Sequence, residues 1–174
     1  MASFEIKNAG LQQMRSDLFG AVEHVGFFLA DYDAEDRRFE LGEWIAIPSE
    51  GFEFQSSYHV SLTDEAIAMV LGRATAAECS LVEVHSHLGY AGAAFSPSDI
   101  IGLREWVPQM RWRLRRRPYA AMVWEDESFD ALAWIETAGA EQVETISVDG
   151  GKAMATTGFT LAEPRRGKGD RVSL

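Results

Sequence analysis

The feature that most constrains the fold is an apolar run, 80–84, that leads directly into His85-Ser86-His87. Such a run is typical of a buried strand. Residues two apart in a strand point to the same face, so the side chains of His85 and His87 should project side by side. The sequence therefore predicts a buried strand that brings two imidazoles to one place.

A third candidate ligand follows this strand. A loop rich in glycine and alanine precedes Ser96-Pro97-Ser98-Asp99 and can bring Asp99 back to the histidines. Two imidazoles and a carboxylate form a three-ligand set for zinc, with a fourth position left for water. The same four residues resemble a helix start, with Ser at the N-cap, Pro at N1 and an acid at N3. The two interpretations are compatible, although an ordinary exposed histidine pair is also consistent with the sequence.

The pattern H-x-H…S-x-x-D resembles the signature of the JAMM (JAB/MPN-plus) zinc metalloproteases, which also has a glutamate far upstream. Glu23 matches that glutamate, because a glycine three residues later and an apolar run follow it, as in the family's first core strand. The resemblance spans residues 4–135 and favours the prokaryotic branch. Eight residues separate His87 from Ser96, where the family usually has seven, and Leu88 replaces the usual proline. This loop is therefore expected to be remodelled.

The resemblance implies an α/β fold: a single MPN/JAB-like, cytidine-deaminase-like domain with a central mixed, largely antiparallel sheet flanked by helices. The 174-residue length suits one domain with a full core. We expect this domain to span 1–162 and a flexible polar tail to span 163–174. Strands are expected at 4–6, 22–32, 38–47, 58–62, 80–84, 119–124, 129–136, 142–148 and 155–161. Helices are expected at 8–20, after Thr63, and at 99–114, where Pro108 should kink or shorten the helix.

The resemblance also assigns roles to the candidate residues. One catalytic Zn²⁺ would be bound by His85, His87 and Asp99, and would lower the pKa of its water to about 7. The general base would be Glu23, and Ser96 would stabilise the oxyanion of the tetrahedral intermediate. Spacing alone leaves the base open, because Glu83 should lie on the histidine face of the same strand. The resemblance chooses Glu23.

The implied activity is cleavage after the C-terminal glycine of a ubiquitin-like protein, by removal from targets or by precursor maturation. Such isopeptidases belong to bacterial ubiquitin-like conjugation pathways, some of them antiviral. Gly89, Gly92 and Phe95 are candidate substrate contacts, since small residues in this loop allow close backbone approach; they could instead form a mobile loop. Alternatives are a JAMM amidase for a small molecule or sulfur-carrier protein, and a non-catalytic MPN scaffold. The loop 48–57 could be a substrate flap or a cover for the core.

Composition excludes several other classes of function. The net charge of −11 argues against nonspecific nucleic-acid binding. Cys79 is the single cysteine, so no internal disulfide can form. No signal peptide or membrane-length apolar run is present, which predicts a cytoplasmic protein. The arginines of 111–117 favour a helix C-terminus, or a docking patch for an acidic partner. The sequence does not determine the oligomeric state.

Overall fold

The computed structural model describes residues 1–89, 91–136 and 139–161, so the expected tail at 163–174 lies outside the described residues. The described part contains ten strands, three α-helices and one 3₁₀ turn. Their bounds are β1 (Ala2–Ile6), α1 (Asn8–Leu18), β2 (Val25–Asp33), β3 (Arg38–Ala46), η1 (Ser49–Gly51), β4 (Phe52–Gln55), β5 (Val60–Leu62), α2 (Asp64–Ala77), β6 (Ser80–His87), α3 (Pro97–Arg113), β7 (Tyr119–Glu125), β8 (Ser128–Trp134), β9 (Glu141–Val148) and β10 (Met154–Ala155).

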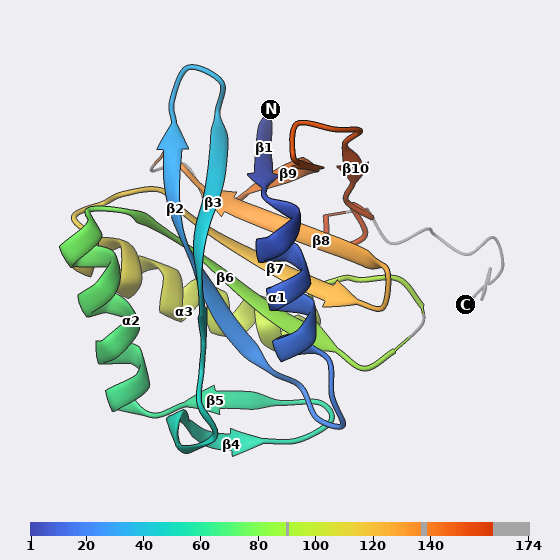
Figure 1. Cartoon of the computed structure of the whole chain (residues 1–174). Helices are drawn as coiled ribbons and strands as arrows, with labels where there is room; N and C mark the ends of the chain where they lie inside the picture. The colour runs from blue at the N-terminus through green and yellow to red at the C-terminus, as the bar shows by residue number, and fades with distance from the viewer. Residues whose placement is uncertain (90, 137–138, 162–174) are drawn as a thin grey trace, which may run out of the picture.

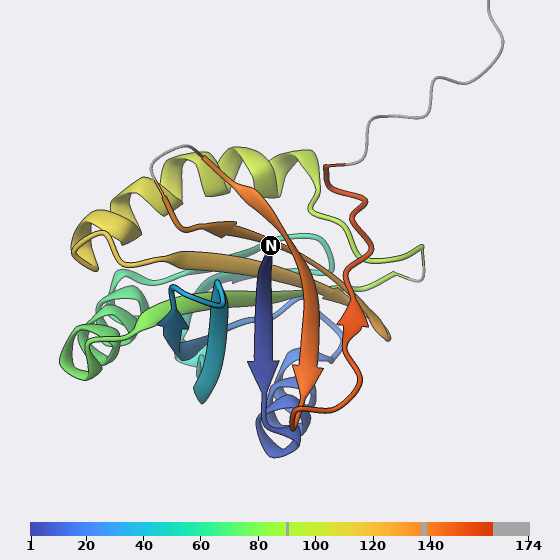
Figure 2. The same ribbon diagram turned by 90° about the horizontal axis from the view of Figure 1, so that it is seen from above.

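Seven of these strands close into a barrel. Their order is β1-β3-β2-β6-β7-β8-β9, and β1 also pairs with β9, which joins the two ends. The pairs β1–β3, β1–β9 and β6–β7 are parallel, and the other pairs in the ring are antiparallel. Figure 2 shows β1 and β9 side by side where the ring closes. The short β4 and β5 form a separate two-stranded sheet.

The expected MPN/JAB-like domain, with a central sheet flanked by helices, is therefore wrong: the chain is a mostly-strand closed barrel with three helices in its described part. The physical reason lies in β1, which the sequence marks only as a short strand. By pairing with both β3 and β9 it removes the two edges that an open sheet would have. Strand periodicity does not identify pairing partners, so this closure left no local signal.

The barrel interior forms one hydrophobic core. It is filled by alternate residues of the strands, among them Phe4, Phe28, Val84 and Met122, and by Met14 and Leu18 from α1. Glycine is required at position 26, because a Cβ there would overlap the indole ring of Trp44. The glycine that follows Glu23 in the sequence therefore has a packing role.

A second core covers the outer face of β2, β6 and β7. α2 and α3 pack on this side, and α3 lies across the strands from α1, as Figures 1 and 2 show. Strands buried on both faces have nearly continuous apolar sequences, which explains why β6 stands out in the sequence. Members of the outer core include Phe27, Leu81, Tyr119, Ala121, Val123, Val70, Ala74, Leu103, Val107 and Met110.

Three helical features can be compared with the sequence. Thr63 caps α2 as expected, since its hydroxyl accepts a hydrogen bond from the Ala66 N–H at 3.2 Å. α3 continues through Pro108 to Arg113, and burial of Met110 and Leu114 offsets a penalty of about 3 kcal/mol for an interior proline. Among the described residues, we find no helix whose length and apolar character would allow it to cross a membrane.

The last expected strand is much shorter than predicted. Only Met154–Ala155 pairs with β9, and the following residues through 161 are not in a strand. Their backbone groups bond instead to side chains and to single carbonyls of neighbouring strands, for example from the Thr157 N–H to the Phe129 carbonyl of β8 at 3.0 Å. In the arginine cluster, Arg111 donates to the carbonyls of Ile135 and Glu136 at 3.0 and 2.8 Å, so this arginine has a structural contact.

Candidate metal centre

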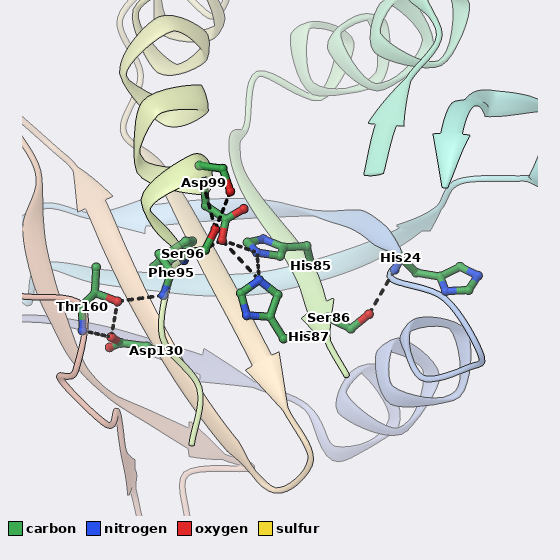
Figure 3. A network of polar contacts seen from close by, with 10 residues as sticks. His24, His85, Ser86, His87, Phe95, Ser96, Asp99, Asp130 and Thr160 are labelled. Atoms are coloured by element: carbon green, nitrogen blue, oxygen red, sulfur yellow. Dashed lines mark hydrogen bonds and ion pairs between the residues drawn. The ribbon is translucent and has the colours of Figure 1, made fainter. Parts of the chain in front are cut away.

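The end of β6 and the start of α3 bring three ligand atoms together. His85 and His87 lie on the outer face of β6, and their Nε2 atoms are 3.3 Å apart. The Oδ2 atom of Asp99 lies 3.6 Å from His85 Nε2 and 3.2 Å from His87 Nε2. Figure 3 shows the three side chains converging from the two elements. The structure thus assembles the three residues that the sequence selected.

This triangle fits one zinc ion. With zinc–ligand bonds of 2.0–2.2 Å, tetrahedral geometry separates neighbouring ligand atoms by about 3.3–3.6 Å. The three observed separations, 3.3, 3.6 and 3.2 Å, bracket that range. Two neutral imidazoles and one carboxylate are also the number and kind of protein ligands that catalytic zinc sites use. Both the spacing and the donor chemistry therefore suit zinc.

Asp99 is held in place by the helix start. The Ser96 N–H donates to Asp99 Oδ2 at 2.7 Å, and the Asp99 N–H donates to Ser96 Oγ at 3.2 Å. These two bonds form a capping box, so the interpretation of S-x-x-D as a helix start is confirmed. The same Oδ2 atom faces both histidines. Its hydrogen bond from the Ser96 N–H therefore fixes the orientation of the oxygen that would bind the metal.

The charged groups of the cluster shift one another's pKa values. Burial disfavours the charged form of Asp99, but contacts with His85 and His87 outweigh it and hold the pKa of Asp99 well below its usual range. Burial also disfavours a charged His87, yet Asp99, Glu23 and Glu125 raise the pKa of this histidine above its usual value. Because a metal ion binds the neutral imidazole, the raised pKa of His87 makes metal binding compete with protonation of this histidine.

Glu23 lies beside this cluster. It stands just before β2, where its N–H donates to the Ser56 carbonyl at 2.8 Å and its own carbonyl accepts from Gln55 Nε2 at 3.1 Å. The residue is 7% exposed, and it lines the same cavity as His85 and Asp99. Burial raises the pKa of Glu23, against the opposing effect of the two histidines. The structure therefore brings the predicted base to the predicted ligands.

The cavity has a volume of about 410 Å³ and lies between the β4–β5 hairpin and α3. Its walls are largely apolar. His59 is part of it, although no motif surrounds this histidine in the sequence. The lining residues are Glu23, Val25, Phe27, His59, Val60, Ser61, Leu62, Ile67, Glu83, His85, Ser98, Asp99, Gly102, Leu103, Glu105, Trp106 and Gln109.

Glu83, the alternative base, lines this cavity too. The Tyr119 hydroxyl donates to Glu83 Oε2 at 2.6 Å, and Trp106 Nε1 donates to the Tyr119 oxygen at 2.9 Å. Burial raises the pKa of Glu83 although the Tyr119 bond opposes the shift. Because this tyrosine already binds Glu83, Glu23 is the freer of the two carboxyl groups. Sequence patterns gave no signal for Tyr119 or Trp106.

Two serines lie at the helix start. Ser96 Oγ accepts the helix-capping bond and lies 2.8 Å from Ser98 Oγ. Ser98 lines the cavity, whereas Ser96 does not. The sequence selected Ser96 as the oxyanion donor and missed Ser98, which differs from an ordinary first-turn serine only through its tertiary position.

The three expected substrate contacts, Gly89, Gly92 and Phe95, are not among the residues that line the cavity. A Cβ at Gly89 would overlap the Glu125 carboxylate. Gly92 has φ +101°, and a Cβ there would lie 2.9 Å from the Phe159 ring. The Phe95 ring packs against His85 with centroids 5.5 Å apart. These residues therefore have packing roles, and contact with substrate stays a prediction.

Ser86, between the two histidines, points into the barrel. Its hydroxyl accepts a hydrogen bond from the His24 N–H and donates to the Leu18 carbonyl, both at 3.0 Å. Its own N–H donates to the His24 carbonyl at 3.0 Å. As Figure 3 shows, the His24 ring lies away from the metal ligands, and it contacts the Val22 carbonyl. Ser86 thus ties the residue after Glu23 to the ligand strand.

Comparison with known proteins identifies the fold alone. No family model matches the chain, and no curated protein matches it. Among solved structures, the chain is similar to the solution structure of protein DSY2949 from Desulfitobacterium hafniense, with a TM-score of 0.53 and 13% sequence identity. That match covers 84% of this chain and 92% of the other. At this identity the similarity concerns the fold and carries no activity.

Proposed function

We propose that this protein is a zinc-dependent peptidase or isopeptidase. The observation that carries the proposal is the triangle of His85 Nε2, His87 Nε2 and Asp99 Oδ2, with separations of 3.2–3.6 Å, beside a cavity that also holds Glu23. The resemblance of these four residues and Ser96 to the JAMM signature supports amide hydrolysis as the reaction class. The resemblance rests on the motif residues, because the barrel differs from the fold expected for that family.

Each side chain has a defined task in this reaction. Zinc held by the two histidines and Asp99 would act as a Lewis acid and supply water of lowered pKa. A carboxylate oxygen of Glu23 takes the proton of the attacking water and returns it to the nitrogen of the leaving amine. Its raised pKa suits the second half of this cycle, in which it acts as an acid. The hydroxyl of Ser96 or Ser98 donates to the carbonyl oxygen as negative charge develops.

The substrate we propose is the C-terminal tail of a ubiquitin-like protein, cut after its last glycine. β5 contributes Val60, Ser61 and Leu62 to the cavity, and among the described residues it pairs with β4 alone. An extended tail can add to such an edge through main-chain hydrogen bonds. Phe54 and Tyr58 on the same hairpin are 49% and 78% exposed, which supports the flap interpretation. A cytoplasmic bacterial conjugation pathway, in some cases antiviral, is the proposed setting.

A second candidate is an amidase that acts on a small molecule or on a sulfur-carrier protein. The cavity of about 410 Å³ favours it, since small-molecule sites typically enclose about 300–1,000 Å³. Glu83, which lines the cavity and is held by the Tyr119 hydroxyl, would give such a ligand a specific polar contact. A scaffold without catalysis is the least supported alternative, because the ligand set and the base are brought together.

The test uses purified zinc-loaded protein, a conjugate of a ubiquitin-like protein joined through its C-terminal glycine, and a short amide substrate. Cleavage of the conjugate by the wild type, and its loss in Glu23→Gln with zinc retained, is the expected result. Cleavage of the short amide alone would support the amidase instead. Zinc binding without cleavage of either substrate would leave the scaffold, and failure to bind zinc would overturn the metal centre.

A further inference from the structure

A buried carboxylate in β8 organises the segment that covers the metal loop. Asp130 is fully buried on the outer face of β8. Its Oδ1 atom accepts hydrogen bonds from Gln142 Nε2 at 2.7 Å and from the N–H groups of Ala131 and Gly158 at 3.0 and 3.3 Å. Its Oδ2 atom accepts from the N–H and the hydroxyl of Thr160 at 2.9 and 2.6 Å.

Only an acceptor without protons suits this position. All five donors are neutral, and they approach both oxygens of the same side chain. A carboxylate offers about four lone-pair sites on two oxygens, whereas Asn offers one oxygen and a competing NH₂ donor. Burying a charge is costly unless hydrogen bonds compensate it, so Asp130 is expected to have a role beyond packing.

Thr160 connects Asp130 to the loop between β6 and α3. Its Oγ1 atom accepts a hydrogen bond from the Phe95 N–H at 3.0 Å. Nearby, Thr157 Oγ1 donates to the Ala93 carbonyl at 2.5 Å, and the Ala93 N–H donates to Ser128 Oγ at 2.9 Å. Residues 91–96 are in no strand or helix, so side chains supply the hydrogen-bond partners that their backbone groups would otherwise find in a neighbouring strand.

The loop held in this way ends at the metal ligands. The Phe95 ring packs on His85, and the next residue, Ser96, donates its N–H to Asp99 Oδ2 at 2.7 Å. Figure 3 shows the path from Asp130 through Thr160 and Phe95 to the ligand triangle. A shift of Thr160 would therefore move the N-cap that orients the ligand oxygen of Asp99.

We infer that Asp130 and Thr160 are positioning residues for the metal centre: together they fix the loop that places Asp99 against His85 and His87. The inference rests on the proposed function, because it concerns the same zinc site. It adds a requirement that the ligand motif does not contain, namely that the segment 157–160 must be docked on β8 for the site to bind zinc tightly.

The experiment measures zinc affinity by competition with a chelator and the visible spectrum of the Co²⁺-substituted protein, whose bands depend on coordination geometry. Thr160→Val keeps the side-chain shape but removes the acceptor for the Phe95 N–H. Zinc affinity should fall about tenfold, near the lower end of the 10–100-fold range for outer-shell partners, and the cobalt spectrum should change. Thr160→Ser, which keeps the hydroxyl, should have the zinc affinity and the cobalt spectrum of the wild type.

Thr156→Val is the matched control. Thr156 directly precedes the segment 157–160. Its hydroxyl donates to the Val143 and Glu144 carbonyls of β9 and accepts from Gln142 Nε2 at 3.4 Å, and it makes no hydrogen bond to the described part of the loop between β6 and α3. This variant should lose comparable stability and keep the wild-type zinc affinity and cobalt spectrum. Equal zinc affinities and spectra for Thr160→Val and wild type would overturn the positioning role and leave the proposed function intact.

Failure of the wild type to bind zinc would overturn the proposed function instead. Hydrogen exchange of the Ser96 amide then decides the structural part of the inference without metal. Faster exchange in Thr160→Val than in Thr156→Val supports the docking of the loop by Thr160. Equal exchange in the two variants overturns it.

Discussion

The metal centre is anchored differently on its two sides. On the side of Glu23, the strands β2 and β6 pair directly, with Val25 opposite His85, and one buried hydroxyl from Ser86 completes the join. On the side of Asp99, the chain leaves the sheet. There the hydrogen bonds of five donors to the Asp130 carboxylate replace the backbone hydrogen bonds of paired strands. Where strand pairing already fixes the chain beside the site, one additional hydrogen-bonding hydroxyl is sufficient to hold it. Where strand pairing ends, a buried carboxylate holds the chain instead.

The largest expected effect removes the centre that both anchors serve. His85→Ala, His87→Ala and Asp99→Ala should each lose stoichiometric zinc, because two remaining protein ligands hold zinc poorly. Metal analysis of the purified variants, with circular dichroism as the control for folding, is the measurement. Full zinc occupancy in all three variants would disprove the site.

Glu23→Gln tests the base on the strand-paired side. Turnover should fall about 10²–10⁴-fold, since a general base typically contributes that much, while zinc content stays unchanged. Rates on a peptide or isopeptide substrate, measured beside zinc content, separate the two effects. A variant that retains turnover while Glu83→Gln loses it would transfer the role of base to Glu83.

The same variant makes a pH-dependent prediction for the metal-free protein. Burial raises the pKa of Glu23, so the folded state binds the carboxyl proton of Glu23 more tightly than the unfolded state does. Above pH about 4.3, the pKa of this carboxyl group in the unfolded state, Glu23 loses its proton more readily in the unfolded protein, and this lowers the free energy of unfolding. Glutamine cannot ionise, so the variant lacks this destabilisation. Glu23→Gln should unfold at a higher temperature than wild type at pH 7, and the difference should vanish as the pH falls below about 4. Equal midpoints at pH 7 would contradict the burial of a charged Glu23.

Ser86→Ala tests the separation of the two anchors. It leaves the partly buried His24 N–H and the buried Leu18 carbonyl without their partner, which should cost about 1–3 kcal/mol in the free energy of unfolding. Turnover should fall more than zinc affinity, because Glu23 moves and the three ligands do not. Denaturant unfolding, kinetics and chelator competition give the three values. Zinc loss as large as in Thr160→Val would show that the two sides are not independent.

The smallest effect is expected from the inner face of the ligand strand. Val84→Ala removes two buried carbons and should lower the free energy of unfolding by about 2 kcal/mol. Zinc affinity should not change, since Val84 belongs to the core inside the barrel whereas the ligands lie on the outer face. Chemical unfolding with parallel zinc titration checks both statements. A large zinc effect would mean that the two faces of β6 are mechanically coupled.

The local parts of the site were predictable from the sequence. The two-residue period of β6 placed His85 and His87 together, and the sequence from Ser96 to Asp99 encoded a capping box that the structure contains. Both depend on neighbours in the chain. Glu23 was found only through resemblance, and it stands before β2 rather than within it.

The remaining parts depend on tertiary contacts that leave no local pattern. Asp130 looks like an ordinary polar residue of a strand, and Thr160 falls in a stretch expected to be a strand. Tyr119 appears as a core aromatic, although its hydroxyl binds Glu83. Barrel closure was missed for the same reason, because the pairing of β1 with β9 joins residues about 140 positions apart.

This long-range pairing imposes an order on the formation of the protein. β1 cannot acquire both of its neighbours until residues 141–148 have been synthesised, so the first strand waits unpaired on one side while β2, β3 and β6 associate. Pairing over such a sequence separation pays its loop-closure entropy late and slows folding. The ligands of β6 and α3 are close in sequence and can approach one another before the ring is complete. Nascent chains that end before β9 should therefore expose the strand edges of an open sheet, and a chaperone that binds such edges would engage them at this stage of synthesis.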